Sequence, residues 1–431
     1  MSHNFPYTGA IFDLDGTVLD SLGVWHHVNE RFFAARGLAI PEDYTRTIAG
    51  MSFSETAAYT VDLCGTGESL EAVEAEWLAM AADEYACDVQ PVPGAREFLR
   101  RLKRAGVRLA AATANRLPLI EPALERLGLI ELFDAILTTG DLGDKNKSDG
   151  ALFRLAADRL GIAPEACVVF EDTLEGIRGA RAAGMGAYAI KSIACAHALD
   201  AIGALADGVL SDFTGADHMW DLPEHPSRCV IFTGWCEGDP SSAYHPLPGD
   251  RVLCADNGWR IAHSAGVVPD LVLGDFDSSE APAAGRVERF PAEKDDTDTM
   301  LCLKRGLSMG FDDFLLVGGF GGRLDHTLAN LQSLHYAARR GVHIEMRDGR
   351  CWATVLADGG SVKVPRTPDK LSVFAMADVC RGVTIRGAKY NTEDATFTNA
   401  FPLGACNNVA DPCAEITLRQ GALLVMTCPD S

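Results

Sequence analysis

The sequence is short of basic residues for its length. Its 38 Lys and Arg residues stand against 60 Asp and Glu residues, which gives a formal net charge of −22. This charge repels phosphate backbones and anionic lipid, and no local block of Lys or Arg offsets it. We therefore expect neither nucleic acid nor a membrane surface as a partner.

Paired cysteines are also missing. The 13 cysteines form no C-x-x-C motif and follow no regular spacing. Scattered thiols are typical of a reducing cytosol, where cysteine serves mainly as a small buried apolar residue. This pattern predicts a cytoplasmic protein without structural zinc.

Long apolar runs are absent too. The most apolar stretch, 192–210, is interrupted by His197, Asp200 and Asp207, and a membrane-spanning helix tolerates such residues poorly. Residues 1–7 lack the basic and apolar regions of a secretory signal. We expect a soluble protein with no secretory signal.

What is present is enough chain for two or three domains of ordinary globular composition. The sequence has 431 residues, of which 47% are hydrophobic and 23% charged, and one hydrophobic core seldom supports that length. Helical periodicity dominates from 22 to about 86, and helix and strand patterns then alternate from 93 to 190. Such alternation predicts a parallel sheet with functional residues at the carboxyl ends of its strands.

Four short motifs in the first half combine acidic residues with hydroxyl and lysine side chains. They are Phe-Asp-Leu-Asp-Gly-Thr at 12–17, the strand-like run 107–113 that ends in Thr, Lys-Ser-Asp-Gly-Ala-Leu-Phe at 147–153, and Glu-Asp-Thr-Leu-Glu-Gly at 171–176. Carboxylate oxygens suit Mg²⁺, while cations neutralise phosphate oxygens. The motifs therefore favour a magnesium-dependent phosphate site.

In this order the motifs resemble those of the haloacid dehalogenase superfamily of phosphohydrolases. The resemblance implies that Asp13 is the nucleophile and forms an aspartyl-phosphate, and that Asp15 is the general acid and base. Thr113 and Lys147 would then hold the phosphoryl oxygens. The implied Mg²⁺ ligands are Asp13, Asp15 through its backbone carbonyl, Glu171 and Asp172.

Two departures from the family pattern leave alternatives open. Ser148 replaces the usual proline after the lysine, and Lys145 is close enough to compete for the role of Lys147. The helical insertion resembles the cap of the β-phosphoglucomutase-like branch, but Trp25 stands where the mutase has a cap histidine. Because His26 and His27 follow directly, a slip of one residue would restore the mutase, although we favour a phosphatase.

The second half carries acidic and glycine-rich motifs of another kind. They are Ala-Asp-Asn-Gly at 255–258, Gly-Asp-Phe-Asp-Ser at 274–278, Lys-Asp-Asp-Thr-Asp at 294–298 and Gly-Gly-Phe-Gly-Gly-Arg-Leu-Asp-His at 318–326. No Gly-x-x-x-x-Gly-Lys-Ser/Thr loop occurs, so a nucleotide would not be held in a P-loop. The order of these motifs resembles that of thiamine pyrophosphokinase over residues 228–431.

The resemblance implies transfer of the diphosphoryl group of ATP to the hydroxyl of thiamine, with AMP as the leaving group. The expected Mg²⁺ ligands are Asp275, Asp277 and Asp298, with Asp295 assisting. Asp325 would orient or deprotonate the hydroxyl. The residues expected to bind ATP and its phosphates are Asp256, Lys294, Gly321, Gly322, Arg323 and His326.

The strand-rich tail resembles the small thiamine-binding domain of the same family. Gly-Ala-Cys-Asn at 404–407 stands where the family has Gly-x-Ser-Asn, so Cys406 and Asn407 are the expected thiamine-binding residues. A cysteine is a weaker hydrogen-bond partner than a serine, and a core-filling Cys406 is equally open. The resemblance also implies a homodimer formed through the C-terminal half.

Together these features predict an α/β multidomain protein. We expect a Rossmann-like haloacid dehalogenase core at 1–220 with an α-helical cap at about 21–90, and a linker at 221–227. An α/β kinase subdomain at 228–365 and a small thiamine-binding β-sandwich at 366–431 would follow.

The predicted function is bifunctional. The C-terminal half would make thiamine diphosphate and AMP from thiamine and ATP, and the N-terminal half would be a magnesium-dependent phosphomonoesterase acting on thiamine monophosphate. One alternative is a sugar-phosphate phosphatase or β-phosphoglucomutase-like mutase unrelated to thiamine. For the second half, the alternatives are a pterin pyrophosphokinase or a non-catalytic thiamine sensor.

Overall fold

The computed structural model divides the chain into two compact units, Met1–Pro223 and Glu224–Ser431. The residues described are 5–430, apart from 49, 50, 52, 66, 144–146, 194, 195, 197, 221, 223–227, 277–285, 292, 294 and 350. Apart from Leu222, the expected linker at 221–227 lies outside them. Among all the residues that the structure describes, no helix is both long enough and apolar enough to cross a membrane.

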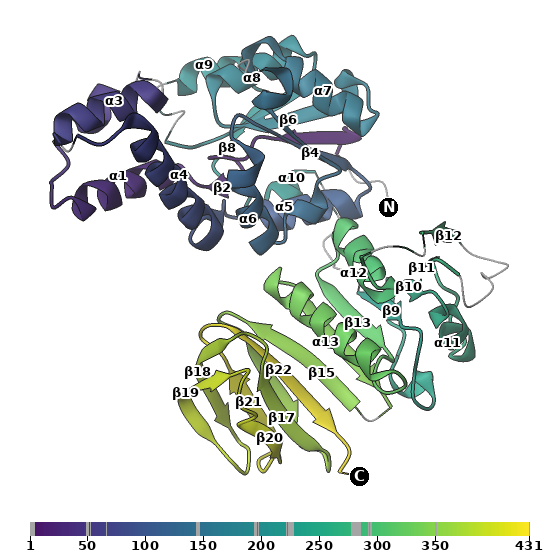
Figure 1. Ribbon diagram of the computed structural model, residues 1–431. Helices are drawn as coiled ribbons and strands as arrows, with labels where there is room; N and C mark the ends of the chain where they lie inside the picture. Colours follow the sequence, from purple (N-terminus) through teal and green to yellow (C-terminus); the bar gives the residue numbers. More distant parts are fainter. Residues whose placement is uncertain are drawn as a thin grey trace. The chain divides into compact units, whose positions relative to one another are not determined.

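Six parallel strands form the sheet of the first unit, in the order β5-β4-β1-β6-β7-β8. Their bounds are Gly9–Phe12 (β1), Arg108–Thr113 (β4), Ala135–Thr138 (β5), Cys167–Glu171 (β6), Gly186–Ile190 (β7) and Gly208–Leu210 (β8). Figure 1 labels β4, β6 and β8 of this sheet. Strands β4 and β5 follow β1 in the chain and lie on one side of it in the sheet. The later strands β6, β7 and β8 lie on the other side of β1. The switch point therefore lies at β1, where open α/β sheets bind their ligands.

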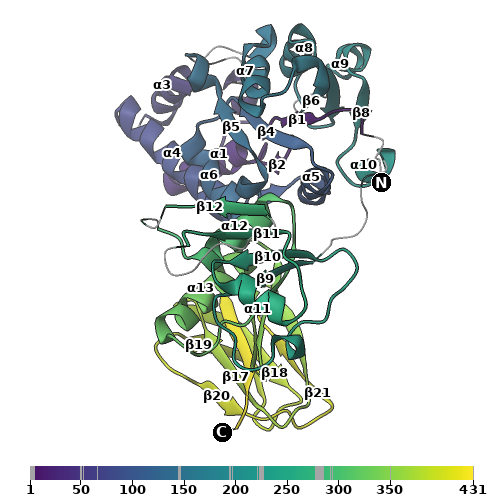
Figure 2. The same cartoon turned by 90° about the vertical axis from the view of Figure 1, so that its right-hand side faces the viewer.

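Helices cover both faces of this sheet (Figure 2). Helices α5 (Ala95–Arg104), α6 (Leu117–Arg126) and α10 (Ala216–Met219) lie on one side, and α7 (Ala151–Leu160), α8 (Leu174–Ala182) and α9 (Leu199–Leu205) on the other. Alternate residues of β1 point to opposite faces, so that Phe12 packs with the first set and Ile11 with the second. The two buried layers fix β1, and with it Asp13, at the centre of the unit.

The predicted all-helical insertion consists of four helices. They are α1 (Val24–Ala35), α2 (Tyr44–Ile48), α3 (Phe53–Cys64) and α4 (Leu70–Cys87). Phe32 and Trp77 pack edge to face with their ring centroids 5.4 Å apart, which joins α1 to α4. The chain leaves and re-enters the core through the short antiparallel pair β2 (Leu19–Asp20) and β3 (Gln90–Pro91).

The second unit is built on a ten-stranded sheet in the order β12-β11-β10-β9-β13-β14-β15-β22-β17-β20. Its first six strands are parallel: Cys229–Phe232 (β9), Arg251–Ala255 (β10), Leu271–Gly274 (β11), Arg286–Arg289 (β12), Asp313–Val317 (β13) and His343–Asp348 (β14). Helices α12 (Asp298–Ser308) and α13 (Leu324–Arg339) pack on one face and α11 (Gly258–Ser264) on the other.

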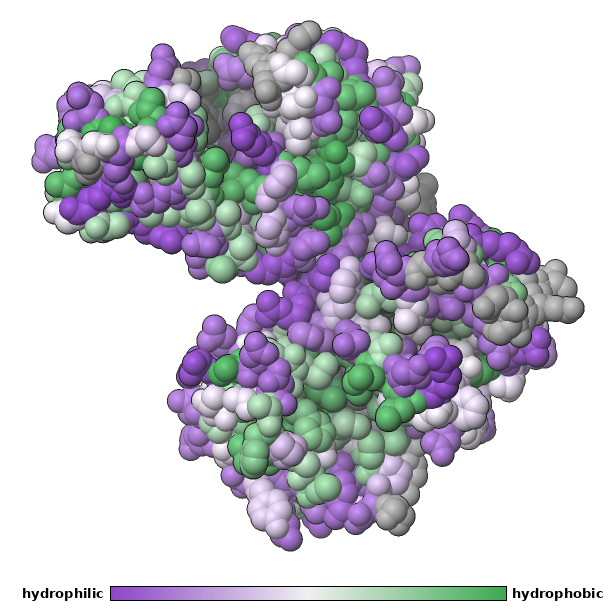
Figure 3. Space-filling model, viewed as in Figure 1, coloured by the Kyte–Doolittle hydropathy of each residue, from purple (hydrophilic) through white to green (hydrophobic). Residues whose placement is uncertain are grey.

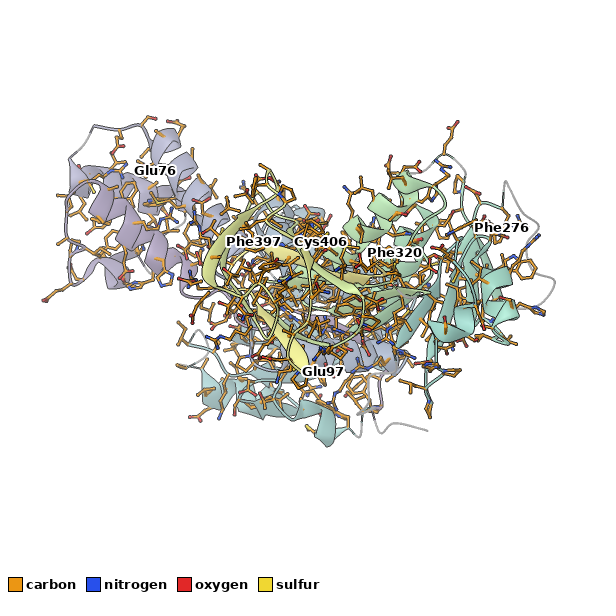
Figure 4. All side chains as sticks on the ribbon, turned by 90° about the horizontal axis from the view of Figure 1, so that it is seen from below. Glu76, Glu97, Phe276, Phe320, Phe397 and Cys406 are labelled. Atoms are coloured by element: carbon orange, nitrogen blue, oxygen red, sulfur yellow. The ribbon has the colours of Figure 1, made fainter. Side chains whose placement is uncertain are left out.

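The remaining strands of this sheet are antiparallel and form one layer of a β-sandwich. They are β15 (Cys351–Ala357), β17 (Lys370–Ala375), β20 (Gly404–Asn407) and β22 (Ala422–Cys428). The other layer has the order β16-β21-β18-β19, formed by Ser361–Pro365 (β16), Val379–Arg386 (β18), Thr392–Thr398 (β19) and Cys413–Thr417 (β21). Buried residues of both layers, such as Val373, Phe397 and Val425, make one core. Figure 4 labels Phe397 of β19 and Cys406 of β20, one residue from each layer.

The structure differs from the sequence prediction at the start of this sandwich. Two of its strands, β15 and β16, precede residue 366, and the sheet continues without a break from the parallel strands into the sandwich. Residues 343–348 form β14, in which exposed and buried residues alternate. This strand was not predicted from the sequence. The two parts predicted as a kinase subdomain and a thiamine-binding domain therefore share a sheet.

Candidate active sites

The first candidate site lies at the carboxyl ends of the central strands of the first unit. Asp13 follows β1, Thr113 ends β4, and Glu171 ends β6. The Asp13 amide donates to the carbonyl of Phe170 at 2.9 Å, which continues the pairing of β1 with β6 one residue beyond the strand. Strand pairing therefore brings together residues that lie far apart in the sequence. The sequence predicted functional residues at these carboxyl ends of a parallel sheet.

A buried ion-pair cluster forms the floor of this site. Lys147, at the start of the short helix η3 (Lys147–Asp149), donates from Nζ to Asp13 Oδ1, and to Glu171 Oε1 at 3.1 Å. Burial raises the pKa of Asp13 well above its usual value, and the Lys147 ammonium opposes this. Burial lowers the pKa of Lys147, but the two carboxylates more than offset it and raise the pKa above its usual value. Lys145, the alternative lysine, lies outside the described residues.

The same cluster fits a divalent cation. Ligand oxygens of Asp13, Glu171 and Asp172 lie within 4.8 Å of one another, and all three residues are buried. Burial raises the pKa of Asp172 to about 6, and its Oδ1 atom has no hydrogen-bond partner. A Cβ at Gly16 would lie 2.4 Å from Asp172 Oδ2, so only glycine leaves this space open. Three carboxylates facing one ammonium carry excess negative charge, which a divalent cation would offset.

Asp15 is held by side chains from three parts of the unit. It accepts hydrogen bonds from Ser21 Oγ at 2.6 Å, Tyr85 Oη at 2.5 Å and Asn115 Nδ2 at 3.2 Å. Tyr85 belongs to cap helix α4, so the cap contacts the second aspartate of the motif directly. Tyr85 was not predicted from the sequence, since nothing in its local pattern marks it. Asn115 was not predicted either, although it stands only two positions after Thr113.

The first candidate site contains a cavity of about 320 Å³. Asp13, Asp15, Thr113, Lys147, Glu171 and Asp172 all line it, so the structure brings together every site residue predicted in this half. Thr113 is fully buried and its Oγ1 accepts from the amide of Asn115 at 3.0 Å. Both oxygens of Glu171 are engaged, one by Lys147 and the other by the amide and hydroxyl of Thr173.

The second candidate site is a cavity of about 380 Å³ at the carboxyl ends of the parallel strands of the second unit. The predicted residues Asp256, Asp298, Gly321, Arg323 and His326 line it. Others around it are Thr233, Trp235, Asn257 and Asn330. Predicted residues Asp275, Asp295, Gly322 and Asp325 are not in its lining, and Asp277 and Lys294 lie outside the described residues.

The glycine loop of this cavity requires glycine for close backbone approach. All four glycines at 318, 319, 321 and 322 have positive φ. A Cβ at Gly318 would lie 2.2 Å from the carbonyl oxygen of Trp235, and the Gly319 amide donates to that same oxygen at 2.8 Å. The loop after β13 is thus bound tightly to the loop after β9.

The predicted acidic and basic residues of the second site are partly paired. Arg323 donates to both carboxylate oxygens of Asp325, at 2.5 and 3.1 Å, and both side chains are exposed. The Arg323 hydrogen bond lowers the pKa of Asp325 to about 2. Asp298 begins helix α12, where Thr297 caps the helix by accepting from the Met300 amide at 3.2 Å. Within the described residues, the acids of this site do not form a cluster of three like that of the first unit.

Asp348 is a buried acid of the second unit that the sequence analysis missed. It ends β14 and accepts from the amide of Glu237 at 2.6 Å, the amide of Phe320 at 3.1 Å and Cys236 Sγ at 3.3 Å. Burial raises its pKa. Its carboxylate therefore joins the loop after β9 to the glycine loop. Figure 4 labels Phe320, whose amide makes one of these bonds.

The two residues expected to bind thiamine have different surroundings. Cys406 is exposed with φ of 59°, so it is not a core-filling residue. Asn407 is buried: its Nδ2 donates to the carbonyl of Tyr390 at 2.7 Å, and its Oδ1 accepts from the amides of Tyr390 and Asn408. The side-chain amide of Asn407 thus stabilises the backbone at Tyr390, whose own side chain is 62% exposed.

Comparison with known proteins gives matches in both units. Residues 7–184 match the family model of haloacid dehalogenase-like hydrolases. Residues 249–346 match the catalytic domain of thiamin pyrophosphokinase, and residues 361–423 match its vitamin B1 binding domain.

Two curated relatives resemble the first unit. A validoxylamine A 7'-phosphate phosphatase of Streptomyces hygroscopicus subsp. limoneus is 31% identical over 208 residues, 48% of this chain and 95% of the relative. A phosphorylated carbohydrates phosphatase of Thermotoga maritima is 29% identical over 176 residues, 41% of this chain and 81% of the relative.

Among solved structures, the thiamine pyrophosphokinase of Bacillus subtilis is 21% identical with a TM-score of 0.43, and the match covers 48% of this chain and all of that one. The family matches confirm the two resemblances and the fold class predicted from the sequence. The chain belongs to the haloacid dehalogenase-like hydrolases through its first unit and carries the catalytic and vitamin B1 binding domains of thiamin pyrophosphokinase in its second, which makes it an enzyme with a phosphatase part and a kinase part.

Proposed function

We propose that this protein makes thiamine diphosphate and that its first unit supplies the thiamine by hydrolysing thiamine monophosphate. The observation that supports this most is the presence of both enzymes on one chain. The kinase needs a free hydroxyl on thiamine, and in the monophosphate that oxygen is blocked. A phosphatase that removes the phosphate would turn an unusable compound into the kinase's substrate.

In the first unit, Asp13 would attack the phosphorus and displace the alcohol, leaving an aspartyl-phosphate. Asp15 would donate a proton to the departing oxygen and then take one from the water that releases inorganic phosphate. Lys147 and Thr113 line the cavity where they can bind phosphoryl oxygens. Both side chains are themselves buried.

Asp13, Asp172 and the backbone carbonyl of Asp15 would hold Mg²⁺ in this site. When bound, the ion offsets the charge shared by the nucleophile and the phosphoryl group. Because Lys147 and Thr173 occupy the oxygens of Glu171, that residue fits a role in positioning Lys147 better than a role as a direct ligand.

In the second unit, the hydroxyl of thiamine would attack the β-phosphorus of ATP, and the bond to the α-phosphate oxygen would break to release AMP. Arg323 and the glycine loop line the cavity where phosphates would bind. A carboxylate with a pKa of about 2 is a poor base, so Asp325 fits the task of orienting Arg323 better than that of deprotonating the hydroxyl. Asp298, Asp275 and Asp277, with Asp295 assisting, remain our proposed ligands for the magnesium that accompanies ATP.

We further propose a cytosolic homodimer. The twelve cysteines described are free, and a reducing compartment would keep them so. Tyr390, Phe401 and Leu403 of the sandwich are 62, 65 and 56% exposed. Figure 3 shows apolar residues gathered over the C-terminal strands on the face in view. In the proposed dimer, a second copy of the chain would cover these side chains.

A sugar-phosphate phosphatase is the second candidate for the first unit, because one relative is named a phosphorylated carbohydrates phosphatase. A mutase is less well supported. His26 pairs with Glu30 and His27 with Glu84, both at 3.3 Å, and neither histidine lines the cavity. The match to a vitamin B1 binding domain disfavours a pterin kinase, and AMP release in the presence of thiamine would exclude a non-catalytic sensor.

A single-pot assay tests the coupled pathway. With thiamine monophosphate, ATP and Mg²⁺, the protein should form inorganic phosphate, AMP and thiamine diphosphate, and free thiamine should appear before the diphosphate. Chromatography of the thiamine compounds together with phosphate release measures this. If thiamine monophosphate stays intact while a hexose phosphate is rapidly hydrolysed, the two units serve different metabolites.

Tyr85→Phe tests the contact between the cap and Asp15. Loss of the 2.5 Å hydrogen bond should reduce phosphatase kcat about tenfold, since a bond to a charged group contributes roughly 1.5–3 kcal/mol and Ser21 and Asn115 remain in place. Tyr59→Phe is the matched control, because Tyr59 stacks on Tyr44 within the same cap. Equal rates for both variants would contradict a positioning role for Tyr85.

A further inference from the structure

Among the described residues that line the second cavity, one has a large aromatic side chain, and no motif of the sequence includes it. Trp235 lies in the loop after β9 and is 53% exposed. Most of the side chains beside it are charged or polar, among them Asp256, Asp298 and Arg323. An indole left this exposed in a polar cavity is available for an aromatic ligand.

The indole ring rests against the glycine loop. A Cβ at Gly322 would lie 3.0 to 3.2 Å from Cδ2, Cε2 and Cγ of Trp235, and one at Gly321 would lie 3.5 Å from its Nε1. A side chain at Gly322 would therefore push the ring from its place. The contact with Gly321 and Gly322 covers only part of the indole ring, and about half of Trp235 stays exposed. The exposed part of the ring can therefore contact a ligand.

The backbone of Trp235 is fixed before any ligand binds. Its carbonyl accepts from the Gly319 amide and from Thr233 Oγ1, both at 2.8 Å. The next two residues, Cys236 and Glu237, are held by the buried carboxylate of Asp348, which also binds the glycine loop. A rigid aromatic side chain loses little freedom on binding a ring, so a fixed indole favours affinity.

We propose that Trp235 is a binding residue of the kinase cavity whose exposed indole surface stacks on an aromatic ring of a substrate. The inference rests on the proposed diphosphokinase function, which brings two ring-bearing molecules to this unit. Adenine in ATP and the rings of thiamine share the flat aromatic surface that an indole recognises. The phosphates would remain with the glycine loop and Arg323.

The test measures binding to the full-length protein by calorimetry, with three probes used separately: α,β-methylene-ATP, thiamine, and tripolyphosphate, which has no ring. Trp235→Leu should raise the dissociation constant about tenfold for one of the two ring-bearing probes and leave that for tripolyphosphate within about twofold. The probe that is weakened identifies the ring. Trp235→Phe, which keeps a ring, should bind within about threefold of the parent.

Two controls separate stacking from damage to the fold. Leu247→Ala removes an exposed apolar side chain of the same unit that does not line the cavity, and it should leave all three dissociation constants unchanged. The melting temperature of Trp235→Leu should match that of the parent. Unchanged binding of both ring-bearing probes by Trp235→Leu would overturn the proposal, and so would an equal loss of tripolyphosphate binding. If the parent chain itself neither binds these probes nor releases AMP, the proposed kinase function fails instead.

Discussion

Asp13→Asn is expected to abolish phosphatase turnover, with a loss on the order of a thousandfold or more, while the kinase rate stays within about twofold of the parent. The amide cannot form the acyl phosphate that the carboxylate forms. Asparagine has nearly the same shape and can still accept from Lys147, so the buried cluster should remain packed. Phosphate release from thiamine monophosphate and from hexose phosphates measures the loss.

The same variant should no longer yield a magnesium-dependent aspartyl-phosphate after rapid acid quenching. Asp20→Asn is a suitable control, because Asp20 is an exposed acid of β2 that does not line the cavity. Hydrolysis at the parental rate in Asp13→Asn would show that another residue is the nucleophile. Parallel loss of the kinase would show that the two compact units do not function independently.

The site of the first unit was predictable because its residues lie in motifs at strand ends. An apolar strand followed by Asp13, or by Glu171 and Asp172, marks a carboxyl edge, and a parallel sheet brings such edges together. The partners of Asp15 were not predictable in this way. Tyr85 reaches it from a helix 70 residues away, and how that helix docks depends on the packing of the whole cap.

In the second unit, the sequence predicted an α/β subdomain, whereas it did not predict the continuation of the sheet into the sandwich. Pairing of β14 with β15 depends on a turn and on long-range register, which local patterns do not report. Trp235 and Asp348 were missed for a related reason. Each acts through contacts between loops that follow different strands, and neither belongs to a motif.

The proposal for the kinase site depends most on Asp298, because this residue of the acidic set is both predicted and present in the cavity lining. It occupies the first turn of α12, where a negative charge stabilises the helix by roughly 0.3–1 kcal/mol. That structural contribution is small compared with the loss of a residue that binds the metal of ATP. The two roles can therefore be separated by experiment.

Asp298→Ala is expected to reduce AMP and thiamine diphosphate formation by at least about a hundredfold at saturating Mg²⁺, with a melting temperature within a few degrees of the parent's. Asp277→Ala is expected to cause a similar loss, because Asp277 belongs to the predicted set of magnesium ligands. Asp277 itself lies outside the described residues. Asp296→Ala is the matched control: this acid is two residues away, pairs with Lys304 at 2.8 Å and does not line the cavity. Its kinase rate should stay within about threefold of the parent's. If Asp298→Ala retained a rate similar to that of Asp296→Ala, the acidic residues that bind the metal of ATP would have to lie elsewhere in the unit.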